Sequence, residues 1–347
     1  MTLALPRRQH SAAGAAILAL ALTLAACGND DSNADADGDN TVASADVPDA
    51  EGDGNDGTVT VQHAQGSADV PVNPETVVAL NNADFTTLSA FGVELAAAPV
   101  SLMGDGTLWP EYMDAPDVGL HMEPNLEVII AAEPDLIITG TRFASFYDDL
   151  VADNPDAVVI DTTAAPESGD IGTDLKRYVE LLGQVFAAED QAAEIIGAYD
   201  DAVAAARDAY NGTDTVMGVI TSGSSLQYAA PVNGRSVGPV FPILDLVPAL
   251  DQEAEDASHG DEISVEAIAA ANPDWLIVLD RDGAVSANEP EYQPAREVIG
   301  ESEALAGTTA VSQDQVIYLD PTFYITEDIQ AYTTLFNQIA EAFAATP

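Results

Sequence analysis

Positive charge is the scarcest property of this sequence. Its 347 residues include nine lysines and arginines against 59 aspartates and glutamates, a formal net charge of -50 at pH 7. A surface this negative repels phosphate backbones, so we expect no nucleic-acid partner. Hydrophobic residues make up 47% of the chain, which is enough for a packed interior and excludes a wholly disordered protein.

Cysteine is almost absent. The single Cys27 excludes an internal disulfide framework and any cysteine-based zinc or iron-sulfur site. It follows Arg7, Arg8 and an apolar run over 12–26, which is the order of an export signal and is too short to span a bilayer. We therefore predict a signal peptide over residues 1–26.

The Leu-Ala-Ala-Cys sequence that ends at Cys27 resembles the lipobox of bacterial lipoproteins. This resemblance implies cleavage before Cys27, lipidation of its thiol, and anchoring of the mature chain to the extracytoplasmic face of the cell membrane. An ordinary secreted protein with a chance cysteine is the alternative. Export by the Sec or the twin-arginine route stays open.

The rest of the chain is long enough for two lobes, since a single core stops growing at about 250–300 residues. Residues 27–57 are polar and acidic and predict a disordered linker. Apolar strands alternating with helical stretches favour an α/β fold, with two doubly wound lobes of parallel sheet over 58–174 and 212–347. Helical periodicity over 175–211 predicts a helical connection between them. We expect a hairpin over 58–72, strands near 77–80, 95–98, 136–139, 158–160, 216–221, 275–279 and 316–319, and a terminal helix over 328–344.

An internal repeat relates the two lobes. Residues 125–142 align with residues 264–281 at a shift of 139 positions, and eight of the eighteen pairs are identical. Each copy reads as a short helix, a proline break and a buried strand that leads to an arginine. Ligands of open parallel sheets bind beyond the carboxyl ends of the strands. We therefore expect Arg142 and Arg281 to face each other across a cleft.

Arg235, in a glycine-bounded loop of the second lobe, is a third candidate. Three converging guanidinium groups suit a ligand with several negative charges, because each offers a planar fork of donors that stays charged. A structural ion pair with a nearby carboxylate is the alternative for each arginine, for instance Arg281 with Asp280 or Asp282.

Motifs for catalysis or for a metal cage are missing. The sequence has no nucleophile elbow, phosphate-binding loop, dinucleotide fingerprint or zinc-protease helix, so we expect no enzyme. The histidines outside the signal lie in unlike contexts, which argues against a carrier of bare transition metal. Trp109 and Tyr228 are candidate pocket aromatics, with core packing as the alternative.

Several short segments together resemble the iron-siderophore-binding lipoproteins of bacterial ABC importers, most closely the branch for ferric catecholates. The resemblance spans about residues 58–345. It implies two lobes joined by one long rigid helix, with little closure on binding. It is carried by Asn73-Pro-Glu-Thr-Val-Val-Ala-Leu80, Glu123-Pro-Asn-Leu-Glu127, Ser258-His-Gly260, Asn272-Pro-Asp-Trp-Leu-Ile-Val-Leu-Asp-Arg281 and Ile317-Tyr-Leu-Asp-Pro321.

The same resemblance implies roles for single residues. Arg142, Arg235 and Arg281 match the arginines that hold a trianionic ferric tris-catecholate. His259 matches a histidine that ligates iron in some members, and Tyr324 matches its tyrosine partner if one residue is deleted; without a gap the position is Ile325. The family's glycine run after this point is replaced here by Thr326-Glu-Asp-Ile-Gln330, so the pocket rim is expected to differ.

The resemblance also implies partners. Glu127 and Glu266 match glutamates that dock each lobe onto a membrane permease; two exposed acids without such a role are the alternative. The function expected is that of a monomeric, membrane-anchored solute-binding protein that delivers a ferric siderophore to an ABC permease. It would need no cofactor of its own, since iron(III) arrives inside the siderophore. Haem or corrinoid binding on the same fold is the alternative, and a secreted hydrolase is a more remote one.

Overall fold

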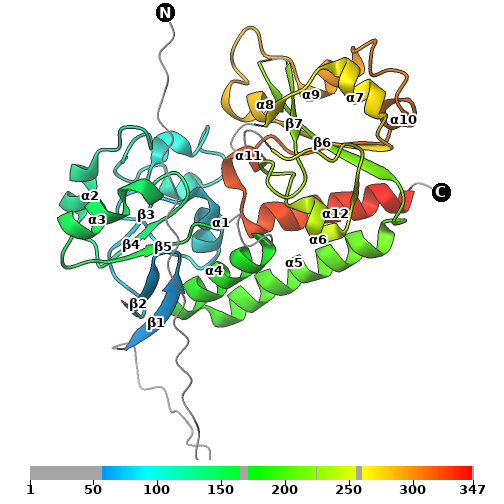
Figure 1. Cartoon of the computed structure of the whole chain (residues 1–347). Helices are drawn as coiled ribbons and strands as arrows, with labels where there is room; N and C mark the ends of the chain where they lie inside the picture. Colours follow the sequence, from blue (N-terminus) through cyan, green and yellow to red (C-terminus); the bar gives the residue numbers. More distant parts are fainter. Residues whose placement is uncertain (1–56, 165–170, 224, 255–259, 346–347) are drawn as a thin grey trace, which may run out of the picture. The chain divides into compact units, whose positions relative to one another are not determined.

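A computed structural model describes residues 57–164, 171–223, 225–254 and 260–345 (Figure 1). The predicted signal peptide, Cys27 and all but the last residue of the predicted linker lie outside these ranges. The chain from Asp53 to Pro347 forms one compact unit. Its described residues form three separate sheets, a two-stranded hairpin and two larger sheets that alternate with helices. The α/β fold class is confirmed.

The N-terminal sheet is purely parallel. It is ordered β3-β4-β5, and its strands are short and apolar, as expected for strands covered on both faces. The predicted hairpin is present as β1 paired with β2, but 95–98 is not a strand: it contributes one isolated bridge, from Ala97 to Val78. The elements of this part are β1 (Thr58–His63), β2 (Gly66–Pro71), β3 (Val77–Ala79), α1 (Asn82–Ala90), α2 (Leu126–Ala132), β4 (Leu136–Thr139), α3 (Tyr147–Asp153) and β5 (Val158–Asp161).

The C-terminal sheet is mixed rather than purely parallel. Its order is β11-β10-β6-β7-β9, and β8 pairs with β6. β10 is parallel to both β6 and β11, whereas β7 is antiparallel to both of its neighbours. A tight turn at Gly223, with a φ of 58°, reverses the chain between β6 and β7. The strands are β6 (Thr215–Ser222), β7 (Ser225–Ala229), β8 (Val247–Pro248), β9 (Asp261–Glu262), β10 (Trp275–Asp280) and β11 (Val316–Tyr318).

The repeat found in the sequence has equivalent local structure in the two copies. α2 and α7 (Val265–Ala271) both end at a residue in the left-handed region, Glu133 with a φ of 48° and Asn272 with a φ of 46°. Asp135 and Asp274 then each accept a backbone N–H at the start of the adjacent strand, at 2.9 and 2.8 Å. The strands that follow, β4 and β10, therefore begin in the same way. The remaining helices of the C-terminal part are α6 (Val240–Leu244), α8 (Arg281–Val285), α9 (Ala295–Gly300), α10 (Thr309–Ser312), α11 (Phe323–Thr326) and α12 (Ile329–Ala345).

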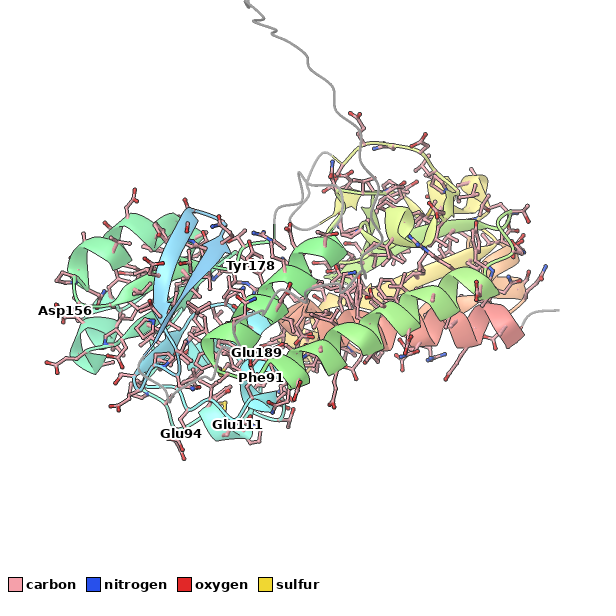
Figure 2. The ribbon with its side chains drawn as sticks, turned by 90° about the horizontal axis from the view of Figure 1, so that it is seen from below. Phe91, Glu94, Glu111, Asp156, Tyr178 and Glu189 are labelled. Carbon is pink, nitrogen blue, oxygen red and sulfur yellow. The ribbon has the colours of Figure 1, made fainter. Side chains whose placement is uncertain are left out.

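The connection is two helices, not the single long helix that was expected. α4 (Ile171–Val185) and α5 (Glu189–Ala209) are separated by a corner at Ala187, whose φ of 50° stops the first helix. A Cβ on Gly183 would lie 2.7 Å from the Cβ of Ala192, so the glycine permits the two helices to pack closely. The predicted boundary at residue 174 also falls inside α4. Figure 2 shows α5 lying against α12, where Tyr199 meets Phe336 edge-on at 5.6 Å.

The two sheets are joined a second time through α1. The Asn82 amide donates to the carbonyl of Ile325 at 3.2 Å, and the Thr86 hydroxyl donates to Asp328 at 2.5 Å. α1 directly follows β3, while Ile325 and Asp328 belong to the segment that returns from the C-terminal sheet. These hydrogen bonds restrain the two parts at the position where a cavity opens between them.

Removing the Phe336 side chain tests the packing of α5 on α12. Phe336 is fully buried, so Phe336→Ala should lower the free energy of unfolding by about 3–5 kcal/mol through lost burial and a new cavity. Chemical denaturation followed by circular dichroism measures this change. The control Asn337→Ala, at an exposed position of the same helix, should change it by less than about 1 kcal/mol. Equal effects of the two changes would contradict this packing.

Candidate functional site

A cavity of about 290 Å³ lies where the two sheets face each other. Its lining comes from the segments that follow β3, β4 and β5, from α4, from the loop 232–239 and from residues 326–332. Three strand ends of one parallel sheet thus open into the same space, which is the usual location of a ligand site in this architecture. Arg142 and Arg235 line it from opposite sheets.

Arg142 reaches the cavity through a constrained turn after β4. A Cβ on Gly140 would lie 2.8 Å from the amide nitrogen of Asn81, so only glycine fits there. Thr141 then has a φ of 35° and donates its backbone N–H to Thr163 at 2.7 Å. Burial and the nearby charge of Arg235 lower the pKa of Arg142 from its usual value. Within the described part of the chain, Arg142 forms no ion pair.

Arg235 sits in a loop that two glycines define. A Cβ on Gly234 would lie 2.3 Å from the backbone nitrogen of Ala230, and one on Gly238 would lie 2.2 Å from the carbonyl oxygen of Gly234. The backbone N–H of Gly238 donates to that same carbonyl at 2.9 Å. The chain folds back on itself so closely that no side chain is tolerated at either position, and Arg235 between them is held toward the cavity.

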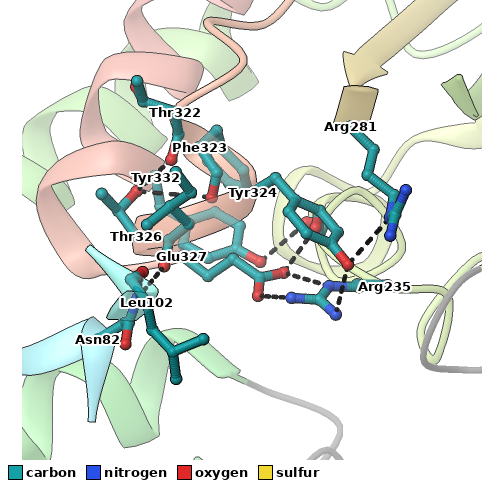
Figure 3. Close-up of polar contacts among 12 residues, drawn as sticks. Asn82, Leu102, Arg235, Arg281, Thr322, Phe323, Tyr324, Thr326, Glu327 and Tyr332 are labelled. Carbon is teal, nitrogen blue, oxygen red and sulfur yellow. Dashed lines mark hydrogen bonds and ion pairs between the residues drawn. The ribbon is translucent and has the colours of Figure 1, made fainter. Parts of the chain in front are cut away.

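Glu327 neutralises Arg235. The guanidinium donates to the two carboxylate oxygens at 2.6 and 3.2 Å, and the Ser236 hydroxyl donates to the same carboxylate at 2.6 Å (Figure 3). Burial by itself would lower the pKa of Arg235, but the charge and hydrogen bonds of Glu327 outweigh it and raise the pKa. Arg235 is therefore held in an ion pair with Glu327 in this structure.

Tyr324 connects Arg235 to Arg281. Its hydroxyl accepts hydrogen bonds from Arg235 at 3.4 Å and from Arg281 at 3.3 Å, and the Arg235 guanidinium lies 4.2 Å from its ring centroid. Arg281 also pairs with Asp282 at 3.2 Å. Figure 3 shows the two arginines on either side of the Tyr324 ring. The Ile325 side chain instead packs in the core of the N-terminal part, so it is Tyr324 that faces the arginines.

Two predicted pocket aromatics are placed elsewhere. Trp109 is buried in the N-terminal core, edge-on to Phe85 at 5.1 Å, and its indole donates to Thr86 at 3.2 Å. Tyr228 is buried between β6 and β9 and donates to the carbonyl of Leu250. Both follow the core-packing alternative and do not line the cavity. His259 lies outside the described residues.

Several lining residues were not anticipated. Asn81 and Asp84 follow β3 directly, and the rule that singled out Arg142, a polar residue after a buried strand, applies equally to them. Tyr178 lines the cavity from α4 (Figure 2), and its hydroxyl donates to the carbonyl of Thr163 at 2.7 Å. The helical periodicity of residues 175–211 does not indicate that Tyr178 faces a cavity.

Two carboxylates near the cavity are buried, Asp84 in its lining and Asp328 in the segment next to Glu327. Burial raises the pKa of Asp84 from 3.8 to about 7, an effect that the Thr162 and Asn81 hydrogen bonds oppose and the charge of Asp328 reinforces. Burial likewise raises the pKa of Asp328 to about 6 against its hydrogen bond from Thr86. At neutral pH both acids therefore titrate, and the Thr162 hydroxyl donates to Asp84 at 2.5 Å.

The described residues contain no cluster of three or more histidine, cysteine or acidic side chains that is arranged to hold a metal ion. The cavity lining instead combines guanidinium groups, the phenols of Tyr178 and Tyr332, and amide donors. This arrangement can bind a bulky anion by charge and hydrogen bonding.

The sequence between residues 77 and 322 matches the model of the periplasmic binding protein family. The chain belongs to this family. Its members are binding proteins rather than enzymes, and the recognition made from the short motifs is confirmed.

Several proteins that are similar to this chain carry the name of a siderophore, or of siderophores as a class, in their own names. The petrobactin-binding protein YclQ of Bacillus subtilis is 25% identical over 296 residues, covering 82% of this chain and 87% of the relative. The ferric-anguibactin-binding protein FatB of Vibrio anguillarum is 28% identical over 276 residues, covering 77% and 82%. The crystal structure of the periplasmic catecholate-siderophore binding protein VctP of Vibrio cholerae superposes with a TM-score of 0.70 at 26% identity, covering 83% of this chain and all of that one.

Asp84→Asn should change the pH dependence of this binding protein's stability. The folded-state pKa of Asp84, about 7, lies above its ordinary value of 3.8, so the native state favours the protonated acid and loses stability as the pH rises through this interval. The asparagine mimics the protonated form. The variant should therefore gain stability over the wild type between about pH 4 and pH 7, by a few kcal/mol at about 1.4 kcal/mol per pKa unit, and the difference should level off above pH 7.

Urea denaturation at a series of pH values measures that difference. Asp201→Asn, at an exposed position on α5, serves as the control and should follow the wild-type profile. A difference between Asp84→Asn and the wild type that is constant from pH 4 to pH 8 would contradict the raised pKa.

Proposed function

We propose that this protein captures a ferric siderophore, of the catecholate class, and delivers it to an ABC permease for iron uptake. The observation that carries the proposal is the cavity at the strand ends, which Arg142 and Arg235 line from opposite sheets. Arg142 has no acidic partner in the described part of the chain. Beside the cavity, the Tyr324 hydroxyl joins Arg235 to Arg281. The siderophore names of the relatives support it. Haem, corrinoid and hydrolase alternatives have no such support.

The iron in this proposal is cargo. Catecholate oxygens of the siderophore complete most or all of its coordination, and the protein supplies charge and hydrogen bonds to the complex. Tyr324 remains a proposed iron ligand, as does His259. The Tyr324 ring lies within 4.2 Å of the Arg235 guanidinium and 5.4 Å of the Arg281 guanidinium.

We also propose a lipid anchor at Cys27, which places the protein as a monomer at the extracytoplasmic face of the membrane. None of the helices that the structure describes combines the length and the apolar composition that a membrane span needs. Attachment through acyl chains is consistent with that observation. The 27–57 segment would then act as the linker between the anchor and the fold.

Arg142 provides the direct test of ligand binding. Arg142→Gln should weaken binding of a ferric catecholate by about tenfold or more, because a buried guanidinium contact to an anion is lost. Quenching of intrinsic fluorescence during titration with the ferric complex measures the affinity. Arg296→Gln removes the same charge at an exposed position on α9 and should leave the affinity unchanged. The proposal fails if the wild-type protein binds no ferric siderophore with micromolar or tighter affinity.

Glu127 and Glu266 are proposed to dock the two lobes on the permease. Both are exposed in the first turn of equivalent helices, α2 and α7. Replacing both with alanine should leave ligand affinity intact but abolish siderophore-dependent iron uptake in cells. Replacing the exposed pair Glu291 and Glu303 removes the same charge and should leave uptake normal. Loss of uptake in both double variants would point to net charge rather than docking.

A further inference from the structure

The cavity carries less positive charge than its arginines suggest. Arg235 is held by both oxygens of Glu327, at 2.6 and 3.2 Å, and Arg281 pairs with Asp282 at 3.2 Å. Only Arg142 has no acidic partner among the described residues. Among the described lining residues, the two guanidinium groups of Arg142 and Arg235 against the carboxylate of Glu327 leave one net positive charge when Asp84 is protonated. If a ligand with three negative charges bound there, two of those charges would not be balanced by positive charge of the described cavity residues.

Glu327 is built into the site rather than reaching over it from the surface. Its backbone is in the left-handed region, with a φ of 45°, at the end of α11. Its carboxylate also accepts the Ser236 hydroxyl at 2.6 Å, and the side chains of Glu327 and Arg235 are only 23% and 17% exposed. Charge-assisted hydrogen bonds between partly buried groups are costly to break. A ligand would therefore meet Arg235 with its charge already compensated.

Asp84 also lowers the net positive charge of the cavity. It lines the cavity and is fully buried beside Thr162. When ionised it adds a further negative charge, so the site becomes no more positive at any pH at which the arginines stay charged.

We propose that Glu327 sets the charge preference of the site, and that the protein favours a monoanionic ferric bis-catecholate over a trianionic ferric tris-catecholate. The inference rests on the siderophore function proposed above. Ferric ion with two doubly deprotonated catecholates carries one negative charge, and a third catecholate adds two more. The monoanionic complex matches the Arg142 guanidinium, which has no acidic partner among the residues that the structure describes.

The test compares two synthetic probes, the ferric complex of a tetradentate bis-catecholamide and that of a hexadentate tris-catecholamide. Binding is measured by fluorescence quenching in about 1 M salt, where the Debye length is about 3 Å and distant surface carboxylates are screened. The wild-type protein should bind the monoanionic probe at least about tenfold more tightly. Glu327→Gln should shift the ratio of the two affinities toward the trianionic probe by about tenfold or more, because the cavity then loses the negative charge of the Glu327 carboxylate.

Two controls separate the local charge from other effects. Glu303→Gln removes one negative charge at an exposed site on the protein surface and should leave the ratio unchanged. The double variant Arg235→Gln with Glu327→Gln removes both members of the pair and restores the wild-type charge of the cavity. The ratio of its affinities for the two probes should return toward the wild-type value, even if both affinities are lower. A purely structural role of Glu327 does not predict this return.

The outcomes distinguish the two proposals. If no variant binds either ferric probe, the siderophore function itself fails. If the wild-type protein binds the trianionic probe as tightly as the monoanionic one, or if Glu327→Gln leaves the ratio unchanged, the charge inference is overturned and the siderophore function stands.

Discussion

The hydrogen bonds from α1 to the segment around α11 are the constraint on which the site depends. Asn82 and Thr86 lie on α1, the helix that follows β3, and they donate hydrogen bonds to Ile325 and Asp328 on the chain that returns from the other sheet. Tyr324 and Glu327 are interleaved with these two positions along the same stretch. The contacts that hold the two sheets together therefore also fix the phenol and the carboxylate that surround Arg235.

Much of the fold is predictable from local patterns. The repeat locates β4 and β10 because a buried strand after a proline is recognisable from its apolar run, and the two copies support each other. The corner at Ala187 is not predictable in this way. Alanine favours helix, and the residue adopts a left-handed conformation only because Gly183 allows α5 to pack against α4. Tertiary contact overrides propensity there, as it does at Ala97, which forms a bridge and not a strand.

Some residues of the site can likewise be predicted from the sequence, and others cannot. Arg142 could be predicted because strand ends in a parallel sheet converge, and the same rule, applied to β3, would have found Asn81 and Asp84. The pairing of Arg235 with Glu327 joins residues 92 positions apart. No periodicity records such a contact, and in a chain with 59 acids any arginine has many possible partners. The departure of 326–330 from the family's glycine run was visible, but its chemical meaning required the geometry.

The glycines that hold the Arg235 loop have an evolutionary consequence. Because Gly234 and Gly238 leave no space for a side chain, substitutions in this turn would disturb the backbone before they altered what the protein recognises. Position 327, at the end of a four-residue helix, already carries a side chain that lines the cavity. Descendants of this protein that change their cargo would do so more readily by exchanging that one carboxylate than by remodelling the loop opposite it.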